Sequence, residues 1–437
     1  MTQEHASRRR RRLTATVTDL QVAVQRAFLV GVVLPGPVEA DEERSLDELS
    51  LLTDTAGADP VDMELVKRHE VDPATFIGKG KAQELANITN ALDIDVVIFD
   101  QQLSPAQQRN LQKIFECDVV DREGLILDIF AQHATTKIGA LQVELALLRY
   151  NLPRLKGKGR SMSQQAAGAG ITNRGPGETK LETDRRRIQH RITRLERELK
   201  ASAGHRETQR KQRRRSQVPQ VSIVGYTNAG KSTLLNALTD ADTLVEDRLF
   251  ATLDPTVRKL SLNGNRDVVL ADTVGFVRRL PHGLVESFQS TLAEAAQSDL
   301  LLQLVDGSDD DPAGQIAAVR EVLDEIGASE IPELLAINKV DSMTPTQRAR
   351  IENLYPDAVM VSALTGEGLD TLVAAVGEAL NKNLILLSLA IPYDRGDLVA
   401  AAHQIGEVVE EKHDESGTVI DVRVPESAVA RFAAYAR

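Results

Sequence analysis

The chain has 437 residues, 42% of them hydrophobic, which is enough for two to four domains with cores of their own. Its formal net charge is −12 and its one cysteine is Cys117, which excludes an internal disulfide and fits a reducing cytosol. No stretch approaches the roughly 18 apolar residues that cross a membrane, and the Arg-rich start lacks the apolar core of a signal peptide, so we expect a cytoplasmic monomer with at most a loose membrane association.

The first 150 residues predict a basic tail and a small parallel α/β domain. Residues 1–20 have the composition of a disordered segment, and their arginine run at 8–12 would add nonspecific attraction to anions. Residues 21–150 alternate strand and helix patterns, which is typical of a parallel sheet. The expected strands are Ala27–Leu34, Met63–Val66, Val96–Phe99 and Asp118–Val120. The expected helices are Ser45–Leu52, Lys81–Leu92, Pro105–Phe115 (with Ser104 as N-cap) and a longer helical zone, Gly124–Arg149.

A short glycine-lysine motif, Gly78-Lys79-Gly80-Lys81, precedes one of these helices. Backbone N–H groups at a helix start attract phosphate, but the motif lacks a Walker pattern. Two interpretations stay open, a phosphate site and a plain glycine turn.

The next segment, 151–215, predicts a basic glycine-rich loop followed by a long helix. From Arg149 to Arg215 the chain has twenty Lys or Arg and six Asp or Glu, a concentration of positive charge that favours an RNA partner. The run at 206–215 is open to another interpretation, a solvated linker. The cations that lie among glycines are the predicted RNA contacts: Arg154, Lys156, Lys158, Arg160 and Arg174.

A long helix is expected from Glu178 to Ala203. Its apolar residues recur at helical spacing and form a narrow seam, which indicates packing against a second helix. The seam consists of Leu181, Ile188, Ile192, Leu195 and Leu199. The zone Gly124–Arg149 is the expected partner, which predicts a helical hairpin with the glycine-rich loop at its tip. An intermolecular coiled coil is the alternative.

A phosphate-binding loop follows in the domain expected at 218–380. Residues 225–232 read Gly-Tyr-Thr-Asn-Ala-Gly-Lys-Ser and match G-x-x-x-x-G-K-[ST] between a strand-like and a helix-like run. Backbone N–H groups of such a loop surround an anion. Lys231 would reach the β- and γ-phosphates, and Ser232 would hold Mg²⁺.

Three further motifs predict that the nucleotide is GTP in a doubly wound α/β domain. Asp272-Thr273-Val274-Gly275 ends a strand, so Asp272 would hold Mg²⁺ through water and the Gly275 N–H would sense the γ-phosphate. Asn338-Lys339-Val340-Asp341 places a carboxylate where guanine offers two donors, and adenine would leave it unpaired. Ser362-Ala363-Leu364 would contact the base. A switch threonine is expected within Phe250–Thr256, with Thr252 and Thr256 as candidates.

These motifs, together with the segment Phe250-Ala251-Thr252-Leu253-Asp254-Pro255-Thr256 and the stretch from Gly168 to Arg186, resemble the HflX branch of the translation-factor-related GTPases. The resemblance favours Thr252 as the Mg²⁺ ligand. It also implies that the N-terminal domain can engage ATP or RNA. The catalytic residues it implies are Lys231, Thr252 and Gly275. The implied GTP-binding residues are Gly225, Tyr226, Thr227, Asn228, Ala229, Gly230, Lys231, Ser232, Thr233, Phe250, Ala251, Thr252, Leu253, Asp254, Asp272, Thr273, Val274, Gly275, Asn338, Lys339, Asp341, Ser362, Ala363 and Leu364.

Two residues bear on the rate of hydrolysis. Phe276 stands where Ras-like enzymes carry the glutamine that orients water, so intrinsic hydrolysis should be slow and should await a partner. Asn228 resembles the potassium ligand of relatives that lack this glutamine; the alternative is an asparagine that only hydrogen-bonds the loop.

The last segment, 384–437, predicts a small α+β docking domain with the order strand, helix, strand, helix, at Ser388–Ile391, Asp397–Glu411, Thr418–Val424 and Glu426–Ala434. The resemblance implies a GTPase that binds the large ribosomal subunit and splits or rescues stalled ribosomes under stress or antibiotic exposure. Two alternatives are an ATP-dependent RNA-remodelling protein with a regulatory GTPase domain and a ribosome-assembly GTPase.

Overall fold

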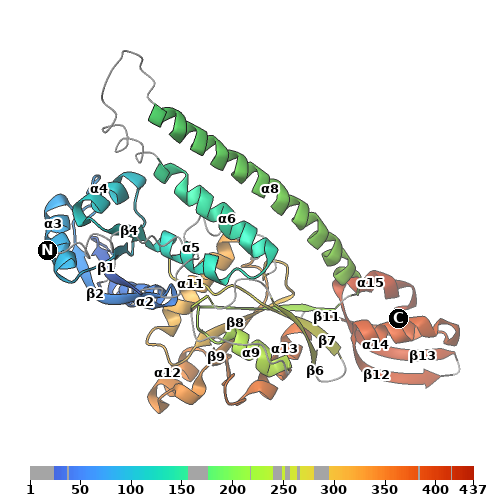
Figure 1. Ribbon diagram of the computed structural model, residues 1–437. Helices are drawn as coiled ribbons and strands as arrows, with labels where there is room; N and C mark the ends of the chain where they lie inside the picture. The colour runs from blue at the N-terminus through green and yellow to red at the C-terminus, as the bar shows by residue number, and fades with distance from the viewer. Residues whose placement is uncertain are drawn as a thin grey trace. The chain divides into compact units, whose positions relative to one another are not determined.

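The computed structural model describes residues 24–36, 39–155, 176–216, 218–239, 249–250, 256–262, 266–279, 295–381, 384–414 and 416–437 (Figure 1). They form two compact units, one holding the described residues up to Ala201 and the other those from Ser202 on. Within these residues no helix combines the length and the apolar character that a membrane crossing requires.

The N-terminal domain is a parallel four-stranded sheet in the order β2-β1-β3-β4, which confirms the predicted fold class. Its strands are β1 (Gln25–Val33), β2 (Ala58–Lys67), β3 (Val96–Phe99) and β4 (Asp118–Asp121). Its helices are α2 (Glu39–Thr55), α3 (Lys79–Ala91), α4 (Pro105–Phe115) and α5 (Arg122–His133). Helix α4 begins at the predicted Ser104, whose side chain forms a capping box with Gln107.

Helices cover both faces of this sheet, which explains why β3 is apolar throughout and β1 is apolar from Ala27 on. Helices α3 and α4 bury Leu85 and Leu111 against Phe28 and Val97 on one face. Helix α2 packs on β1, β2 and α5 on the other. Strand β2 is longer than predicted because it is an edge strand, where Pro60 and exposed acidic residues are tolerated.

The helical zone predicted at 124–149 is present, and it divides into two helices. Helix α5 ends at His133 and α6 (Lys137–Asn151) begins after Thr136, whose hydroxyl accepts a hydrogen bond from the Gly139 N–H at 3.0 Å. Thr136 has the extended backbone of an N-cap residue, with a φ of −87° and a ψ of 154°, which separates the two helices. A short 3₁₀ turn, η1 (Pro153–Leu155), follows α6.

Helix α8 (Pro176–Ser216) pairs with α6, so the expected helical hairpin is present and its second helix is longer than predicted (Figure 1). Side chains of α8 are described from Glu182 to Ser202. Ile192 and Leu195 of the predicted seam are buried against Leu145 of α6. Ion pairs flank this apolar contact.

The second unit contains a six-stranded sheet in the order β10-β9-β8-β5-β7-β6, with only β6 antiparallel among the described strands. Its strands are β5 (Gln220–Gly225), β6 (Val257–Leu262), β7 (Arg266–Asp272), β8 (Leu300–Asp306), β9 (Glu333–Asn338) and β10 (Val359–Met360). Its helices are α9 (Lys231–Thr239), α11 (Pro312–Glu325), α12 (Pro345–Leu354) and α13 (Leu369–Asn381), with a 3₁₀ turn η2 (Val340–Ser342).

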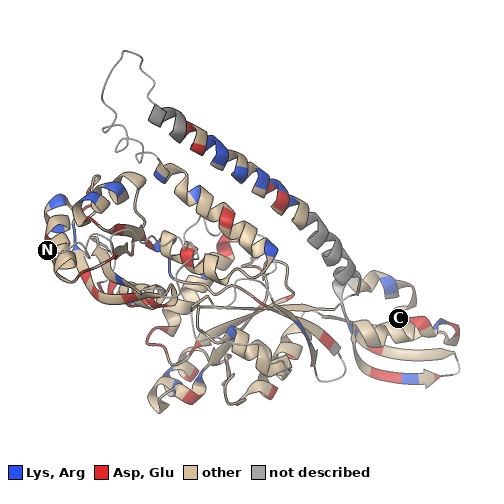
Figure 2. Cartoon of the chain, in the orientation of Figure 1, with Lys and Arg blue, Asp and Glu red and all other residues tan. Residues whose placement is uncertain are grey.

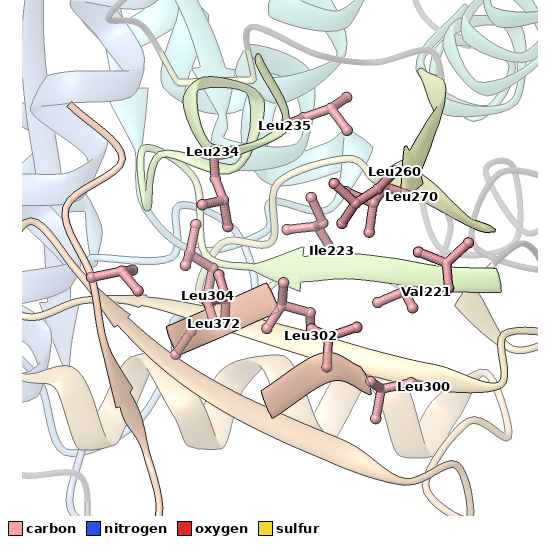
Figure 3. Close-up of a cluster of buried hydrophobic side chains, with 14 of the residues drawn as sticks. Val221, Ile223, Leu234, Leu235, Leu260, Leu270, Leu300, Leu302, Leu304 and Leu372 are labelled. Carbon is pink, nitrogen blue, oxygen red and sulfur yellow. The ribbon is translucent and has the colours of Figure 1, made fainter. Parts of the chain in front are cut away.

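The sheet is wound on both faces, as the doubly wound prediction requires. Figure 3 shows Val221, Ile223 and Leu302 of the sheet meeting Leu234 of α9 and Leu372 of α13. A second cluster joins β8 and β9 to α11 and α12. The carboxyl ends of the parallel strands therefore share one edge, where ligands bind in such folds.

The C-terminal domain has three antiparallel strands in the order β11-β13-β12. Its elements are β11 (Leu384–Ile391), η3 (Tyr393–Arg395), α14 (Gly396–Ile405), β12 (Glu407–Asp414), β13 (Gly417–Pro425), α15 (Glu426–Phe432) and η4 (Ala433–Tyr435). The helix predicted at Asp397–Glu411 is wrong in its second half. Gly406 ends α14, where a Cβ would lie 2.6 Å from the Arg423 carbonyl oxygen, and Val408 pairs with β13.

Candidate nucleotide-binding site

The glycine loop joins the carboxyl end of β5 to the start of α9. Two of its glycines are required by their surroundings: a Cβ on Gly225 would lie 2.3 Å from the Leu304 carbonyl oxygen, and one on Gly230 would lie 2.3 Å from Asn338 Nδ2. Gly230 also has a φ of 88°, in the left-handed region. The predicted motif thus folds as a strand–loop–helix, which places the N–H groups of the first turn of α9 at the loop.

Lys231 lies inside this loop. Its Nζ donates to the carbonyl oxygens of Tyr226 at 2.8 Å and Gly225 at 3.2 Å, and the residue is 7% exposed. Burial lowers the pKa of Lys231 to about 8, while the nearby Asp272 carboxylate acts in the opposite direction. A buried cation that donates to two neutral carbonyls would gain from an anionic ligand.

Ser232 and Asp272 form a polar pair beside the lysine. Ser232 Oγ donates to Asp272 Oδ2 at 2.7 Å, and Asp272, at the end of β7, is 1% exposed. The next residue, Thr273, donates from its hydroxyl to the Ile223 carbonyl at 2.8 Å. The hydroxyl and carboxylate predicted to share Mg²⁺ are therefore adjacent, and both offer the oxygen atoms that this ion prefers.

The segment after Asp272 is joined to the glycine loop by backbone hydrogen bonds. The Thr227 N–H donates to the Phe276 carbonyl at 2.7 Å, and the Phe276 N–H donates to the Gly225 carbonyl at 3.2 Å. Gly275 lies so close to the loop that a Cβ would be 2.7 Å from Thr227 Cγ2. The Phe276 ring is 1% exposed, so it packs in the core and cannot orient water.

Sequence reasoning missed a network that continues from this segment. The Arg278 N–H donates to the Tyr226 hydroxyl at 2.6 Å, and the Arg278 guanidinium is ion-paired with Asp311. Asp311 also caps α11 by accepting from the Gly314 N–H at 3.0 Å. The Asp-Pro start of α11 was a detectable helix cap, but its pairing with Arg278 spans 33 residues and leaves no local pattern.

Asn338 connects three of the predicted motifs. Its Nδ2 donates to the Ala229 carbonyl at 2.8 Å, and its Oδ1 accepts from the Ala363 N–H at 2.9 Å. The side chain is 2% exposed. Asn338 therefore fixes the glycine loop and the loop after β10 relative to each other, a positioning role rather than a demonstrated contact with a base.

Asp341 is exposed, with its carboxylate held from one side. The buried Ser362 donates to its Oδ1 at 2.5 Å and Ser342 to its Oδ2 at 3.1 Å. The Ser362 hydrogen bond is the main reason why the pKa of Asp341 lies below its usual value. Lys339, in the left-handed region, pairs with Asp306 at 2.7 Å. Leu364 is 80% exposed and offers an apolar surface beside these residues.

The remaining predicted residues differ in what the structure records of them. Ala251, Thr252, Leu253 and Asp254 fall outside the described residues, whereas Phe250 is buried. Thr256, the other switch candidate, accepts a hydrogen bond from the Asp272 N–H at 2.9 Å through its carbonyl. Thr233 is half-buried on α9. Asn228 is exposed, with a φ of 59°, and the structure records no hydrogen bond from its side chain to a described residue.

The predicted RNA contacts divide in the same way. Lys156, Lys158, Arg160 and Arg174 fall outside the described residues. Arg154 has its donors committed within the chain: it binds Asp121 at 3.0 Å and Gln108 at 2.8 Å, and it stacks 3.5 Å from the centre of the Tyr150 ring. Its geometry therefore gives it a positioning role, joining η1 to the N-terminal sheet.

The glycine-lysine motif at 78–81 forms the start of α3. Gly78 has a φ of 82° and precedes the helix without a side-chain cap. Lys81 is ion-paired with Glu64 at 3.0 Å and Glu84 at 2.8 Å. Because Lys81 is already ion-paired, the glycine-turn interpretation is sufficient to explain this helix start. The structure adds no support for a phosphate site there.

Four family models match the chain in succession. They are described as GTP-binding GTPase N-terminal (residues 43–131), GTP-binding GTPase middle region (133–213), 50S ribosome-binding GTPase (220–339) and HflX C-terminal domain (347–433). A protein named GTPase HflX from Caldanaerobacter subterraneus is 44% identical over 400 residues, which cover 92% of this chain and 91% of that protein.

The chain belongs to the HflX family of GTPases. GTPase HflX of Escherichia coli is likewise 44% identical, over 93% of this chain and 95% of its own length. A solved structure described as SsGBP in complex with GDP has a TM-score of 0.46 at 26% identity, covering 82% of this chain and 99% of that one. The family resemblance drawn from the glycine loop is confirmed, and so is the prediction of a GTP-hydrolysing enzyme.

Proposed function

We propose that this chain is a ribosome-associated GTPase that binds the large ribosomal subunit and splits or rescues stalled ribosomes under stress or antibiotic exposure. One observation carries the proposal: the glycine loop, the Ser232–Asp272 pair and the Asp341 carboxylate converge on one edge of the second sheet, in a chain that also holds a basic helical hairpin. The description of the model matched at 220–339, a 50S ribosome-binding GTPase, supports the choice of partner. The chain would act as a cytoplasmic monomer.

The site would bind GTP at its two ends. At the phosphates, Lys231 would exchange its two carbonyl partners for phosphate oxygens, and the N–H groups at the start of α9 would complete the anion site. At the base, Asp341 would accept hydrogen bonds from guanine, with Ser362 holding it charged. Mg²⁺ bound by Ser232, by Asp272 through water and by Thr252 would neutralise charge that develops on the phosphates.

Turnover by this site alone should be slow. Phe276 is buried. Its backbone N–H and carbonyl both hydrogen-bond the glycine loop, which holds Gly275 against that loop. A γ-phosphate contacting the Gly275 N–H would pull this segment toward the nucleotide, and hydrolysis would release it, which is the general switch of such enzymes. The partner would then supply what the missing glutamine does not.

The exposed Asn228 supports a role for potassium. Asn228 lies in the left-handed region, and its amide oxygen accepts no recorded hydrogen bond from the described residues, which fits a monovalent-cation ligand better than a residue that only hydrogen-bonds the loop. Potassium there would add positive charge beside the phosphates, in the manner of an arginine finger. Replacing potassium with sodium should therefore slow turnover.

Nucleotide binding at pH 8 and above should be coupled to the uptake of a proton by Lys231. The free protein holds Lys231 with a pKa of about 8, and phosphates would raise that value, so at pH 8 binding should add about half a proton to the complex. Above that pH the affinity should fall, by at most about tenfold per pH unit for one proton. Calorimetry in two buffers of different ionisation enthalpy measures this uptake. Lys231→Arg, which stays charged, is the control; no uptake by the natural protein at pH 8 would contradict the assignment.

Sedimentation of stalled ribosomes tests the proposed role. With GTP, the protein should convert 70S particles into subunits and migrate with mature large subunits. Migration with precursor particles, without splitting, would instead support the assembly GTPase.

A further inference from the structure

The side of α8 that faces away from α6 carries exposed basic residues at helical spacing. Arg186, His190, Arg197 and Lys200 recur at intervals of four, seven and three, which keeps them on one side of a helix, and all four are exposed. Figure 2 shows the abundance of Lys and Arg along the described part of α8. We call these four residues the basic stripe.

Several other charges on this helix have partners. Arg191 holds Glu144 of α6 through two hydrogen bonds of 2.7 and 2.6 Å, and Arg149 of α6 holds Glu196 at 2.8 Å. Arg194 pairs with Glu198 at 2.9 Å. Glu144 and Glu196 are therefore ion-paired within the hairpin and do not neutralise the basic stripe.

The stripe itself is weakly paired. Arg197 and Lys200 make no ion pair with any residue in the described part of the chain. Arg186 lies 3.4 Å from Glu182, but both side chains are well exposed, and such a pair contributes little because water screens it. Positive charge along this surface is therefore available to an external anion.

We propose that the basic stripe binds the phosphate backbone of RNA, a surface separate from the glycine-rich loop. This inference rests on the proposed ribosomal function. The occupant is a polyanion because the stripe holds three Arg or Lys residues, whereas residues 182–202 contain no Phe, Tyr or Trp and offer a base only the small imidazole ring of His190. An anionic membrane fits poorly, since a membrane-surface helix must insert its apolar side and here Ile192 and Leu195 are buried against α6.

The dimensions of the stripe fit a backbone contact. From Arg186 to Lys200 the helix rises about 21 Å at 1.5 Å per residue, so the cations can face several phosphates in succession. Arginine and lysine at these sites donate charge-assisted hydrogen bonds to phosphate without reading the base sequence. The stripe would add affinity and orientation, with a marked dependence on salt.

The test uses the full chain with three substitutions, Arg186→Gln, Arg197→Gln and Lys200→Gln. Glutamine is a good helix former, so α8 is retained, and GDP affinity should be unchanged. Binding is measured with isolated large ribosomal subunits and with a fluorescent RNA duplex over a range of salt. The triple variant should bind both tenfold or more weakly, and its salt slope should fall by about 2 to 3, since each lost phosphate contact contributes roughly 0.7–0.9.

A matched control carries Lys113→Gln, Arg350→Gln and Arg431→Gln, three exposed cations outside α8. Equal affinity and equal slope for the stripe variant and the natural protein would overturn the inference, as would a preference of the stripe for anionic lipid vesicles over RNA. If the natural protein fails to bind large subunits at all, the proposed function itself is wrong, which separates the two failures.

Discussion

Replacing Asp341 with asparagine should move the preference of the nucleotide site from guanine toward xanthine. The carboxylate is placed to accept from two guanine donors, and Ser362 keeps it in position and charged. Asparagine accepts with one atom only and presents a donor to the other guanine donor. Each hydrogen bond to a charged group contributes about 1.5–3 kcal/mol, so losing one of the two predicts a fall of roughly ten- to a hundredfold in GDP affinity, and the remaining bond is weaker because its acceptor is neutral.

Titration of fluorescent GDP and XDP measures this change. XDP should bind the Asp341→Asn variant more tightly than GDP, because xanthine offers a carbonyl to the new amide. Asp357→Asn, an exposed carboxyl in the same domain, serves as the control and should leave both affinities unchanged. Unaltered guanine selectivity in Asp341→Asn would remove this residue from base recognition.

Replacing Arg122 with methionine should strongly destabilise the N-terminal domain. Arg122 begins α5 and is almost fully buried, where it binds Asp100 at 2.5 Å and is ion-paired with Glu48 of α2. Ser45 donates to the same Asp100 at 2.8 Å. Removing the cation leaves two buried carboxylates uncompensated, and breaking a buried pair in this way costs about 3–5 kcal/mol.

Hydrogen exchange of the full chain, followed by mass spectrometry, measures this loss in the peptides of β1, β3 and β4. A loss of that size should speed their slowest exchange by a hundredfold or more, since each 1.4 kcal/mol is about tenfold. Arg44→Met, which removes an exposed pair with Asp41, should change exchange little. Adding Asp100→Asn and Glu48→Gln to Arg122→Met should restore part of the protection. Exchange as slow as in the natural protein would show that the cluster is not a stabilising element.

Local patterns in the sequence were sufficient where a single segment determines both structure and chemistry. The glycine loop needs its glycines because Leu304 and Asn338 approach its backbone closely, so the motif reports its own geometry. Ser104 and Pro105 mark a helix start through hydrogen bonds made within four residues. Asp272 and Asp341 each follow a strand of a parallel sheet or its adjoining turn, so their place at the common edge follows from topology.

Contacts between distant segments were not predictable in this way. Arg154 lies among glycines and lysines in the sequence, and its commitment to Asp121 and Tyr150 becomes visible only when η1 packs on the N-terminal sheet. Strand β12 was predicted as a helix because charged residues such as those it contains are common in helices and in strands. Its pairing with β13 makes the segment a strand. The same holds for Arg278 and Asp311, whose ion pair fixes the segment after Gly275.

GTP hydrolysis by the full chain, alone and with isolated large ribosomal subunits in potassium buffer, tests the central claim most directly. Hydrolysis alone should be slow, because Phe276 is buried, and the subunits should stimulate it tenfold or more, about 1.4 kcal/mol of barrier. Deleting residues 156–174 should spare GTP affinity and abolish the stimulation. Fast hydrolysis by the protein alone, unchanged by the subunits, would contradict the account.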